Sequence, residues 1–96
     1  MVVVWSLQAR NELKKVFERI SLDSLQNAEK VRDTIIDLTL SLSLHPKKFP
    51  LDKYKLNNDG SWRAFEKYNL RVSYRLMTNE VRIVRLRHTK QNPKTY

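Results

Sequence analysis

Residues 70–76, Leu-Arg-Val-Ser-Tyr-Arg-Leu, alternate strictly between apolar and polar side chains. Successive side chains of a β-strand point to opposite faces, so this pattern predicts a strand with one apolar face and one face that carries two arginines. Thr78-Asn79 marks a tight turn, and residues 80–88 predict a second strand. Its alternation slips at Ile83-Val84, which predicts a β-bulge. The bulge would keep the apolar side chains inward and leave three arginines outward: Arg82, Arg85 and Arg87.

The segment before these strands predicts a third strand over residues 62–68. The preceding Asn57-Asn58-Asp59-Gly60 is a turn pattern in which the one glycine supplies a positive-φ position. Because strands 62–68, 70–76 and 80–88 are joined by short connections, we expect an antiparallel β-meander.

The N-terminal half predicts a strand and two helices. Val2-Val3-Val4-Trp5 is a β-branched and aromatic run typical of a buried strand. Ser6 is a good N-cap for an amphipathic helix that runs through about Ile20. A second helix is expected from about Leu25 to Leu44, where His45-Pro46 ends it. The short link between the helices predicts an antiparallel helical hairpin.

These elements predict one α+β domain over residues 1–96, in the order β-α-α-β-β-β. The 96 residues are 41% apolar and 30% charged, which suits a single folded core. The single glycine and three prolines leave little room for a flexible linker. The apolar stripes of the helices are expected to pack on the sheet.

Composition excludes several classes of chemistry. The absence of cysteine removes disulfides, thiolate zinc sites and cysteine nucleophiles, and fits a reducing compartment. Phosphate-binding loops, glycine-rich dinucleotide turns and nucleophile elbows are also missing, so we expect no metal and no cofactor. The N-terminus lacks signal-peptide features and no apolar run is long enough to span a membrane. We therefore expect a cytoplasmic protein that does not bind membranes.

The net charge of +9 is unevenly distributed. Residues 1–48 carry eight Lys or Arg against six Asp or Glu, whereas residues 49–96 carry eleven against four. Such a localised positive field attracts nucleic acid or an acidic protein. The alternative is that the charge serves solubility.

Cationic and aromatic groups that suit RNA cleavage cluster near the ends of the last strands. Cleavage without a metal needs a base for the 2′-hydroxyl proton, fixed cations for the phosphorane-like transition state and an acid for the leaving oxygen. Arginines offer bidentate phosphate contacts, a histidine can serve as acid or base, and a tyrosine can serve if nearby cations lower its pKa from about 10. The candidate catalytic residues are Arg71, Arg87, His88, Lys90 and Tyr96. The candidate residues for binding nucleic acid or a partner are Arg63, Lys67, Arg75 and Arg85.

Each candidate also has a purely structural interpretation. His88 can be a surface histidine at a strand end, and Tyr96 can be an unordered terminal residue. Four aromatic residues are interpreted as core or half-buried strand residues, with base stacking by one of them as the alternative. These are Trp62, Phe65, Tyr68 and Tyr74.

The order and spacing of several motifs resemble the RelE/ParE superfamily, the toxins of bacterial type II toxin–antitoxin pairs. The resemblance covers nearly the whole chain. It includes the opening Val-Val-Trp strand, the helix with Leu13 and Ile20, and the Leu42-x-x-x-Pro46 helix end. Its most specific parts are Asn27-Ala28-x-x-Val31-x-x-x-Ile35, Leu70-Arg71-Val72-Ser73-Tyr74 and Val81-x-Ile83-x-Arg85-x-Arg87-His88.

The resemblance implies a sheet backed by the helical hairpin, and a cognate antitoxin that is acidic where it wraps the toxin. RelE-like members are mRNA interferases, which are endoribonucleases that enter the ribosomal A site and cleave mRNA there. ParE-like members instead poison DNA gyrase and are not nucleases. The Asn27-Ala28 helix is similar to ParE-like members. Lys90, six residues before Tyr96, is similar to the RelE-like pattern, although an arginine is usual there.

If the RelE-like correspondence holds, Arg71 and Lys90 stabilise the phosphate and Tyr96 or His88 is the base. Ribosome-dependent mRNA cleavage is the first hypothesis. Inhibition of DNA gyrase without nuclease activity is the alternative, and a non-toxic basic RNA-binding module is the third.

Overall fold

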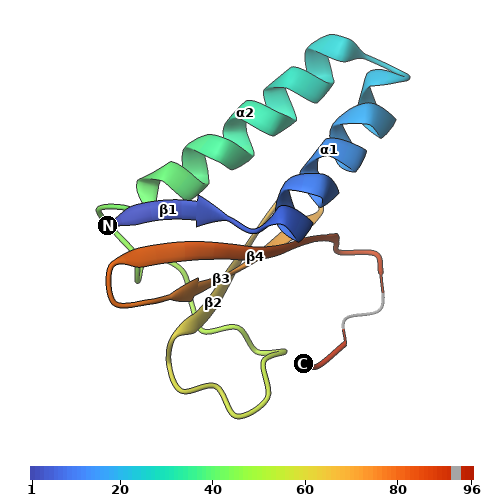
Figure 1. Cartoon of the computed structure of the whole chain (residues 1–96). Helices are drawn as coiled ribbons and strands as arrows, with labels where there is room; N and C mark the ends of the chain where they lie inside the picture. Colours follow the sequence, from blue (N-terminus) through green and yellow to red (C-terminus); the bar gives the residue numbers. More distant parts are fainter. Residues whose placement is uncertain (92–93) are drawn as a thin grey trace.

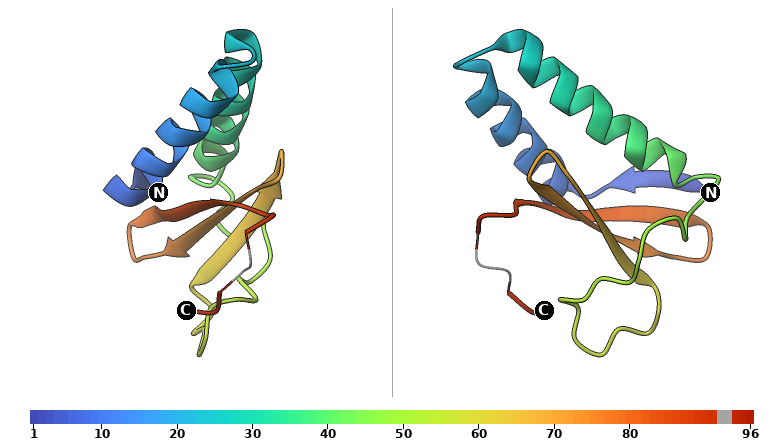
Figure 2. Two further views of the ribbon diagram at one scale, coloured as in Figure 1. Left: turned by 90° about the vertical axis from the view of Figure 1, so that its right-hand side faces the viewer. Right: turned by 180° about the vertical axis from the view of Figure 1, so that it is seen from behind.

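The structure, a computed structural model, describes residues 1–91 and 94–96. Two helices cover one side of a four-stranded sheet, while the connection before the second strand and the C-terminal segment lie toward the other side (Figures 1 and 2). The order strand, helix, helix and three strands is as predicted. The elements are β1 (Val2–Trp5), α1 (Leu7–Ser21), α2 (Leu25–Ser41), β2 (Trp62–Lys67), β3 (Leu70–Leu76) and β4 (Glu80–His88). Within the described part of the chain, no helix is both long and apolar enough to cross a bilayer.

The strand order in the sheet is β1-β4-β3-β2. β3 pairs antiparallel with both β2 and β4, which confirms the predicted meander. β1 pairs parallel with β4, so that Val3 lies beside Val81 and Trp5 beside Ile83. The sheet is therefore mixed, with the first strand at its edge beside the last. Parallel pairing needs a long crossover, which the helical hairpin and the following strands supply.

Serine side chains start both helices. The Ser6 hydroxyl accepts a hydrogen bond from the Ala9 N–H at 3.0 Å, and the Ser24 hydroxyl accepts one from the Asn27 N–H at 3.1 Å. Each bond satisfies one of the backbone donors that a helix start leaves open. α2 ends at Ser41, three residues before the predicted end, because the next three N–H groups, of residues 42–44, bond to carbonyls only three residues back and tighten the chain into turns before Pro46.

The core lies between the sheet and the helical hairpin. The sheet contributes alternate side chains of β3 and β4, and Tyr74 among them is fully buried with its hydroxyl donating to the Pro46 carbonyl at 3.1 Å. Each fully buried aliphatic side chain contributes about 1.5–3 kcal/mol relative to exposure. The buried cluster includes Ala9, Val31, Ile35, Leu42, Phe65, Leu70, Val72, Val81, Ile83 and Leu86.

The predicted bulge in β4 is confirmed. Tyr74 lies opposite Ile83, whereas Ser73 lies opposite Arg85, so Val84 is the extra residue. The insertion keeps both Ile83 and Leu86 buried, because it resets the alternation between them. It also directs Arg85 to the carboxylate of Glu12 on α1, at 3.2 Å.

The connection between β2 and β3 differs from the prediction. β2 ends at Lys67, and Tyr68 and Asn69 form a two-residue turn with φ angles of 54° and 60°. Tyr68 is 39% exposed, so its expected place among half-buried strand residues is wrong. The twist of a tight hairpin demands left-handed residues at both positions, and this requirement overrides the strand preference of tyrosine.

Candidate functional site

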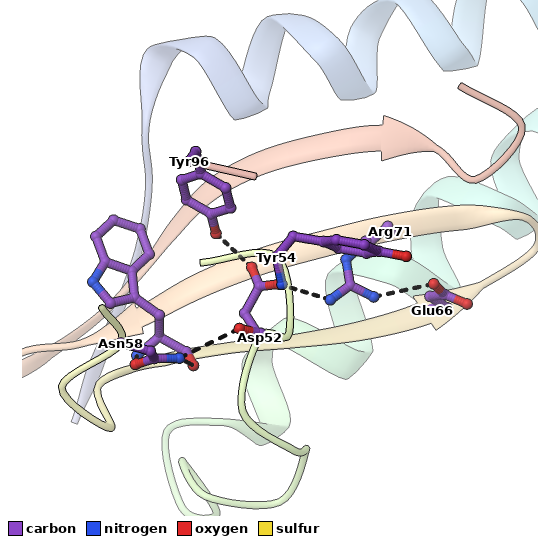
Figure 3. A network of polar contacts seen from close by, with 7 residues as sticks. Asp52, Tyr54, Asn58, Glu66, Arg71 and Tyr96 are labelled. Atoms are coloured by element: carbon purple, nitrogen blue, oxygen red, sulfur yellow. Dashed lines mark hydrogen bonds and ion pairs between the residues drawn. The ribbon is translucent and has the colours of Figure 1, made fainter. Parts of the chain in front are cut away.

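A buried carboxylate organises the side of the sheet that faces away from the helices (Figure 3). Asp52, in the connection before β2, is fully buried. Its Oδ1 accepts hydrogen bonds from the Arg71 guanidinium at 2.8 Å and the Tyr54 N–H at 3.0 Å. Its Oδ2 accepts one from the Tyr96 hydroxyl at 2.5 Å. Three distant segments of the chain thus meet at one side chain.

The network holds Asp52 and Arg71 in their charged forms. Burial alone opposes ionisation of the carboxyl, but the hydrogen bonds from Tyr96 and Arg71 outweigh it and keep the pKa of Asp52 below its ordinary value. Burial likewise opposes the charge on the guanidinium, yet Asp52 and Glu66 raise the pKa of Arg71 above its ordinary value. Because Arg71 is only 15% exposed and faces two carboxylates, little of its positive charge reaches the surroundings.

Tyr96 is an ordered part of this network. Its N–H donates to the Tyr54 carbonyl at 3.0 Å, and its ring meets Trp62 edge-on with centroids 5.6 Å apart. Burial, reinforced by the hydrogen bond to the Asp52 carboxylate, raises the pKa of Tyr96 to about 12. An RNA-cleaving base needs a pKa lowered from about 10, so the environment of Tyr96 shifts this group in the opposite direction.

A spectrophotometric titration tests the state of Tyr96. The difference between the phenolate absorbance of the wild-type protein and that of Tyr96→Phe is expected to rise near pH 12, above the ordinary value of about 10. Since folding raises this pKa, the stabilisation from Tyr96 is complete below pH 10 and is lost as the pH rises from about 10 to 12. A difference signal centred below pH 10 would contradict the burial of this hydroxyl.

The structure brings some predicted catalytic residues together and separates others. Arg87 lies opposite Arg71 in the β3–β4 register, and its guanidinium lies 5.9 Å from the centre of the Tyr96 ring. His88 borders a narrow cleft beside Arg71 and Arg87, and it also borders separate clefts at the end of the sheet. Lys90 lines only one of the latter, together with Arg19. Their predicted catalytic roles stay predictions.

The four predicted binding residues differ in the contacts that they make within the protein. Arg63 donates to the Phe49 carbonyl at 2.6 Å, and its Nε is buried without a hydrogen-bond partner among the described residues. Arg85 is paired with Glu12, as described above. Arg75 lies over the Trp62 ring at 5.0 Å and 3.9 Å from the exposed Asp59, and Lys67 lies over the Tyr68 ring. Arg75 and Lys67 therefore remain the more accessible of the four.

A second feature, which the sequence analysis did not identify, is an apolar groove on the helical side of the molecule. It has a volume of about 530 Å³ and lies between α1, α2 and the end of β1. The Arg32 guanidinium lies over the Phe17 ring at 5.0 Å. The apolar lining is Trp5, Leu13, Phe17, Ile36 and Leu40, and the cations that line it are Arg10, Lys14 and Arg32. The helical periodicity had assigned Leu13 and Phe17 to an apolar face, but that pattern does not distinguish a core from a groove.

The structure offers no metal centre in its described residues, where no three His, Asp or Glu side chains converge. Asp52 and Glu66 are instead bridged by Arg71. Neither Asp52 nor Glu12 was identified from the sequence, because a single carboxylate carries no recognisable motif.

The chain matches one family model and is similar to a solved structure. The family model described as ParE toxin of type II toxin-antitoxin system, parDE, matches residues 3–93. Among solved structures, the chain is similar to one described as the chromosomal ParDE TA system from P. aeruginosa, with a TM-score of 0.73 and 16% sequence identity. The match covers 94% of this chain and 97% of the other, and at that identity it shows a common fold. No curated protein matches the sequence significantly.

Proposed function

Because this chain belongs to the ParE toxin family and is the toxin of a type II toxin–antitoxin pair, we propose that it arrests growth by inhibiting DNA gyrase, without cutting RNA. The RelE/ParE resemblance offers two targets, and the ParE-like one agrees with the family that matches residues 3–93. Inhibition by binding requires no catalytic base. The chemistry around Asp52 supports this choice.

The state of Tyr96 carries the proposal. A phenol with a pKa of about 12 that donates a hydrogen bond to Asp52 is poorly suited to take a proton from a 2′-hydroxyl. Arg71 is held between Asp52 and Glu66, so its charge is offset before any phosphate arrives. The network therefore serves to hold the C-terminal segment against the sheet.

One observation favours mRNA cleavage as the second candidate. Arg71 and Arg87 lie opposite one another across β3 and β4, with Tyr96 beside Arg87. Two arginines that are direct neighbours on adjacent strands can both contact one phosphate group. Cleavage would require the Asp52 contacts to rearrange when RNA binds.

Two assays on the same variants decide between these targets. The purified toxin is expected to inhibit supercoiling by gyrase or to trap cleaved DNA. Tyr96→Phe is expected to retain this activity within about twofold, because the hydroxyl contributes about 1.5–3 kcal/mol to the fold through its hydrogen bond to a charged carboxylate and nothing to the chemistry. Primer extension on messages from expressing cells is expected to show no new ends. New ends that disappear in Tyr96→Phe, with gyrase unaffected, would establish mRNA cleavage. Harmless expression with neither effect would favour the non-toxic RNA-binding module.

The family implies a cognate antitoxin, and the apolar groove is the surface that best suits it. The groove exposes aromatic and aliphatic side chains beside three cations. An amphipathic helix with acidic flanks would cover the apolar lining and pair with Arg10, Lys14 and Arg32. An acidic antitoxin could therefore pair with cations in the N-terminal half of the chain as well as in the more basic C-terminal half.

A further inference from the structure

Two adjoining clefts lie at the end of the sheet, where the chain leaves β4. One, of about 330 Å³, is lined by Arg19, His88, Lys90 and Gln91. The other, of about 300 Å³, shares Arg19 and His88 and adds residues of α2 and of the β2–β3 turn, including Asn27, Tyr68 and Asn69. Figure 2 shows the tip of the β2–β3 hairpin rising toward the helices. The shared residues make the clefts one continuous surface.

The charges that line these clefts have one sign. Arg19 comes from the last turn of α1, and Lys90 follows β4. Neither forms an ion pair within residues 1–91 and 94–96, and no Asp or Glu of that part lines either cleft. Cations that share a cleft without a counter-charge repel one another and focus a positive potential into it. An anion bound there relieves the repulsion.

His88 adds a hydrogen-bond donor. Its Nδ1 accepts the Lys90 N–H at 3.1 Å. A neutral imidazole that accepts at Nδ1 carries its proton on Nε2, so the second ring nitrogen is left as a donor. Two cations and this N–H together match the acceptor oxygens of a phosphate group.

Tyr68 adds an aromatic surface. It holds a left-handed backbone conformation, with φ of 54°, that a residue other than glycine or asparagine rarely adopts. The residue is 39% exposed and lines the cleft, so it contributes little to the core. The tight hairpin accounts for the left-handed conformation, but not for an exposed tyrosine at a position that favours asparagine or glycine, and this choice of residue points to a role for the side chain. A ring beside a cationic cleft is the arrangement on which nucleic-acid bases stack.

We propose that these clefts bind single-stranded nucleic acid, with a phosphate between Arg19 and Lys90 and a base on the Tyr68 ring. The amides of Asn27, Asn69 and Gln91 supply both donors and acceptors for base edges, whereas an ionised carboxylate ligand would use only the donors. A single strand is required because a paired base cannot reach an aromatic side chain. His88 and Gln91 also border the cleft beside Arg71, whereas Arg19, Tyr68 and Lys90 do not line it. The proposed site therefore adjoins the Asp52 network, but it does not depend on which target the toxin has.

Fluorescence anisotropy with a labelled single-stranded DNA of roughly 12 nucleotides tests the site. The double variant Arg19→Gln/Lys90→Gln is expected to bind at least tenfold more weakly than wild type. Loss of the contacts to this one phosphate is also expected to reduce the slope of log affinity against log salt by about 0.7. The matched control is Lys15→Gln/Lys30→Gln, which removes the same charge from exposed helix positions outside the clefts and is expected to change affinity less than threefold.

A second variant separates stacking from charge. Tyr68→Asn removes the ring but suits the left-handed turn, so the hairpin is retained. It is expected to weaken binding of the oligonucleotide at least fivefold and to leave binding of inorganic polyphosphate unchanged. Equal weakening by both double variants would overturn the proposal, as would full affinity of Tyr68→Asn. Dependence on Arg19 and Lys90 seen only with a glutamate-rich peptide would assign the clefts to an acidic protein instead.

Discussion

The variant Ile36→Glu is expected to arrest growth as the wild type does while co-expression of the antitoxin no longer rescues the cells. Ile36 forms part of the apolar lining of the groove between the helices. A carboxylate there removes an apolar contact, which costs about 2 kcal/mol or more at a central interface position, and it opposes the acidic flanks of the antitoxin. Since about 1.4 kcal/mol is a factor of ten, we expect affinity for the antitoxin to fall at least about 30-fold.

Leu22→Glu is the matched control for this experiment. Leu22 is 86% exposed, lies in the link between the helices and does not line the groove. The same change of side chain there is expected to leave both toxicity and rescue intact. Growth rescue and co-purification of the two proteins measure the outcome. Unimpaired rescue of Ile36→Glu would show that the antitoxin docks elsewhere, and loss of toxicity in it would show that the groove serves the toxic activity.

The variant Asp52→Ala is expected to lose about 3–4 kcal/mol of unfolding free energy. Removing one partner of a buried ion pair leaves the other charge uncompensated, which typically costs about 3–5 kcal/mol. Glu66 still contacts Arg71 in the variant, so the lower part of this range applies. The Tyr96 hydroxyl and the Tyr54 N–H also lose their acceptor. Urea denaturation followed by circular dichroism measures the change as a fall in the transition midpoint of about 2 M.

Asp59→Ala provides the comparison, because Asp59 is an exposed carboxylate 3.9 Å from Arg75 and such pairs contribute little. Asp59 also accepts hydrogen bonds from Ser61 in an exposed turn, so the midpoint of this variant is expected to fall, but by less than half as much as that of Asp52→Ala. The two proteins should also respond differently to acid. Since folding lowers the pKa of Asp52, its contribution is present above an ordinary pKa of about 3.9 and is lost as the pH falls below it. Asp52→Ala should lack this part of the acid dependence, and equal midpoints for both variants would contradict the buried network.

The elements themselves were largely predictable from local chemistry. Ser6 and Ser24 begin the helices through hydrogen bonds that span three residues, and such bonds depend only on nearby sequence. The slip at Ile83-Val84 gave the bulge, because burial of both Ile83 and Leu86 is possible only with one extra residue between them. The helix end at Ser41 and the turn at Tyr68 were misjudged, since hydrogen-bond geometry there prevails over the side-chain pattern.

The candidate site was predictable only in part. Arg71, Arg87 and Tyr96 were chosen by residue type, and the structure does bring them together. Their chemistry depends on Asp52, which lies 19 residues from Arg71 and 44 from Tyr96. This carboxylate changes Tyr96 from a candidate base into a hydrogen-bond donor with a raised pKa. The proximity of Arg19 to Lys90 was likewise not predictable from the sequence, because the two share a cleft only where α1 packs beside the end of the sheet.

Periodicity, capping and composition are properties of the chain, and they were enough to establish the α+β class, the order of the elements, the faces of the last strands and the excess of positive charge in the C-terminal half. The parallel place of β1 beside β4, the groove between the helices and the partners of each arginine became known only from the folded arrangement. Those features arise where segments far apart in the chain meet. A local side-chain pattern does not show which distant carboxylate will lie beside a given cation. That pairing determines how much of the cation's charge remains uncompensated and how far its pKa shifts.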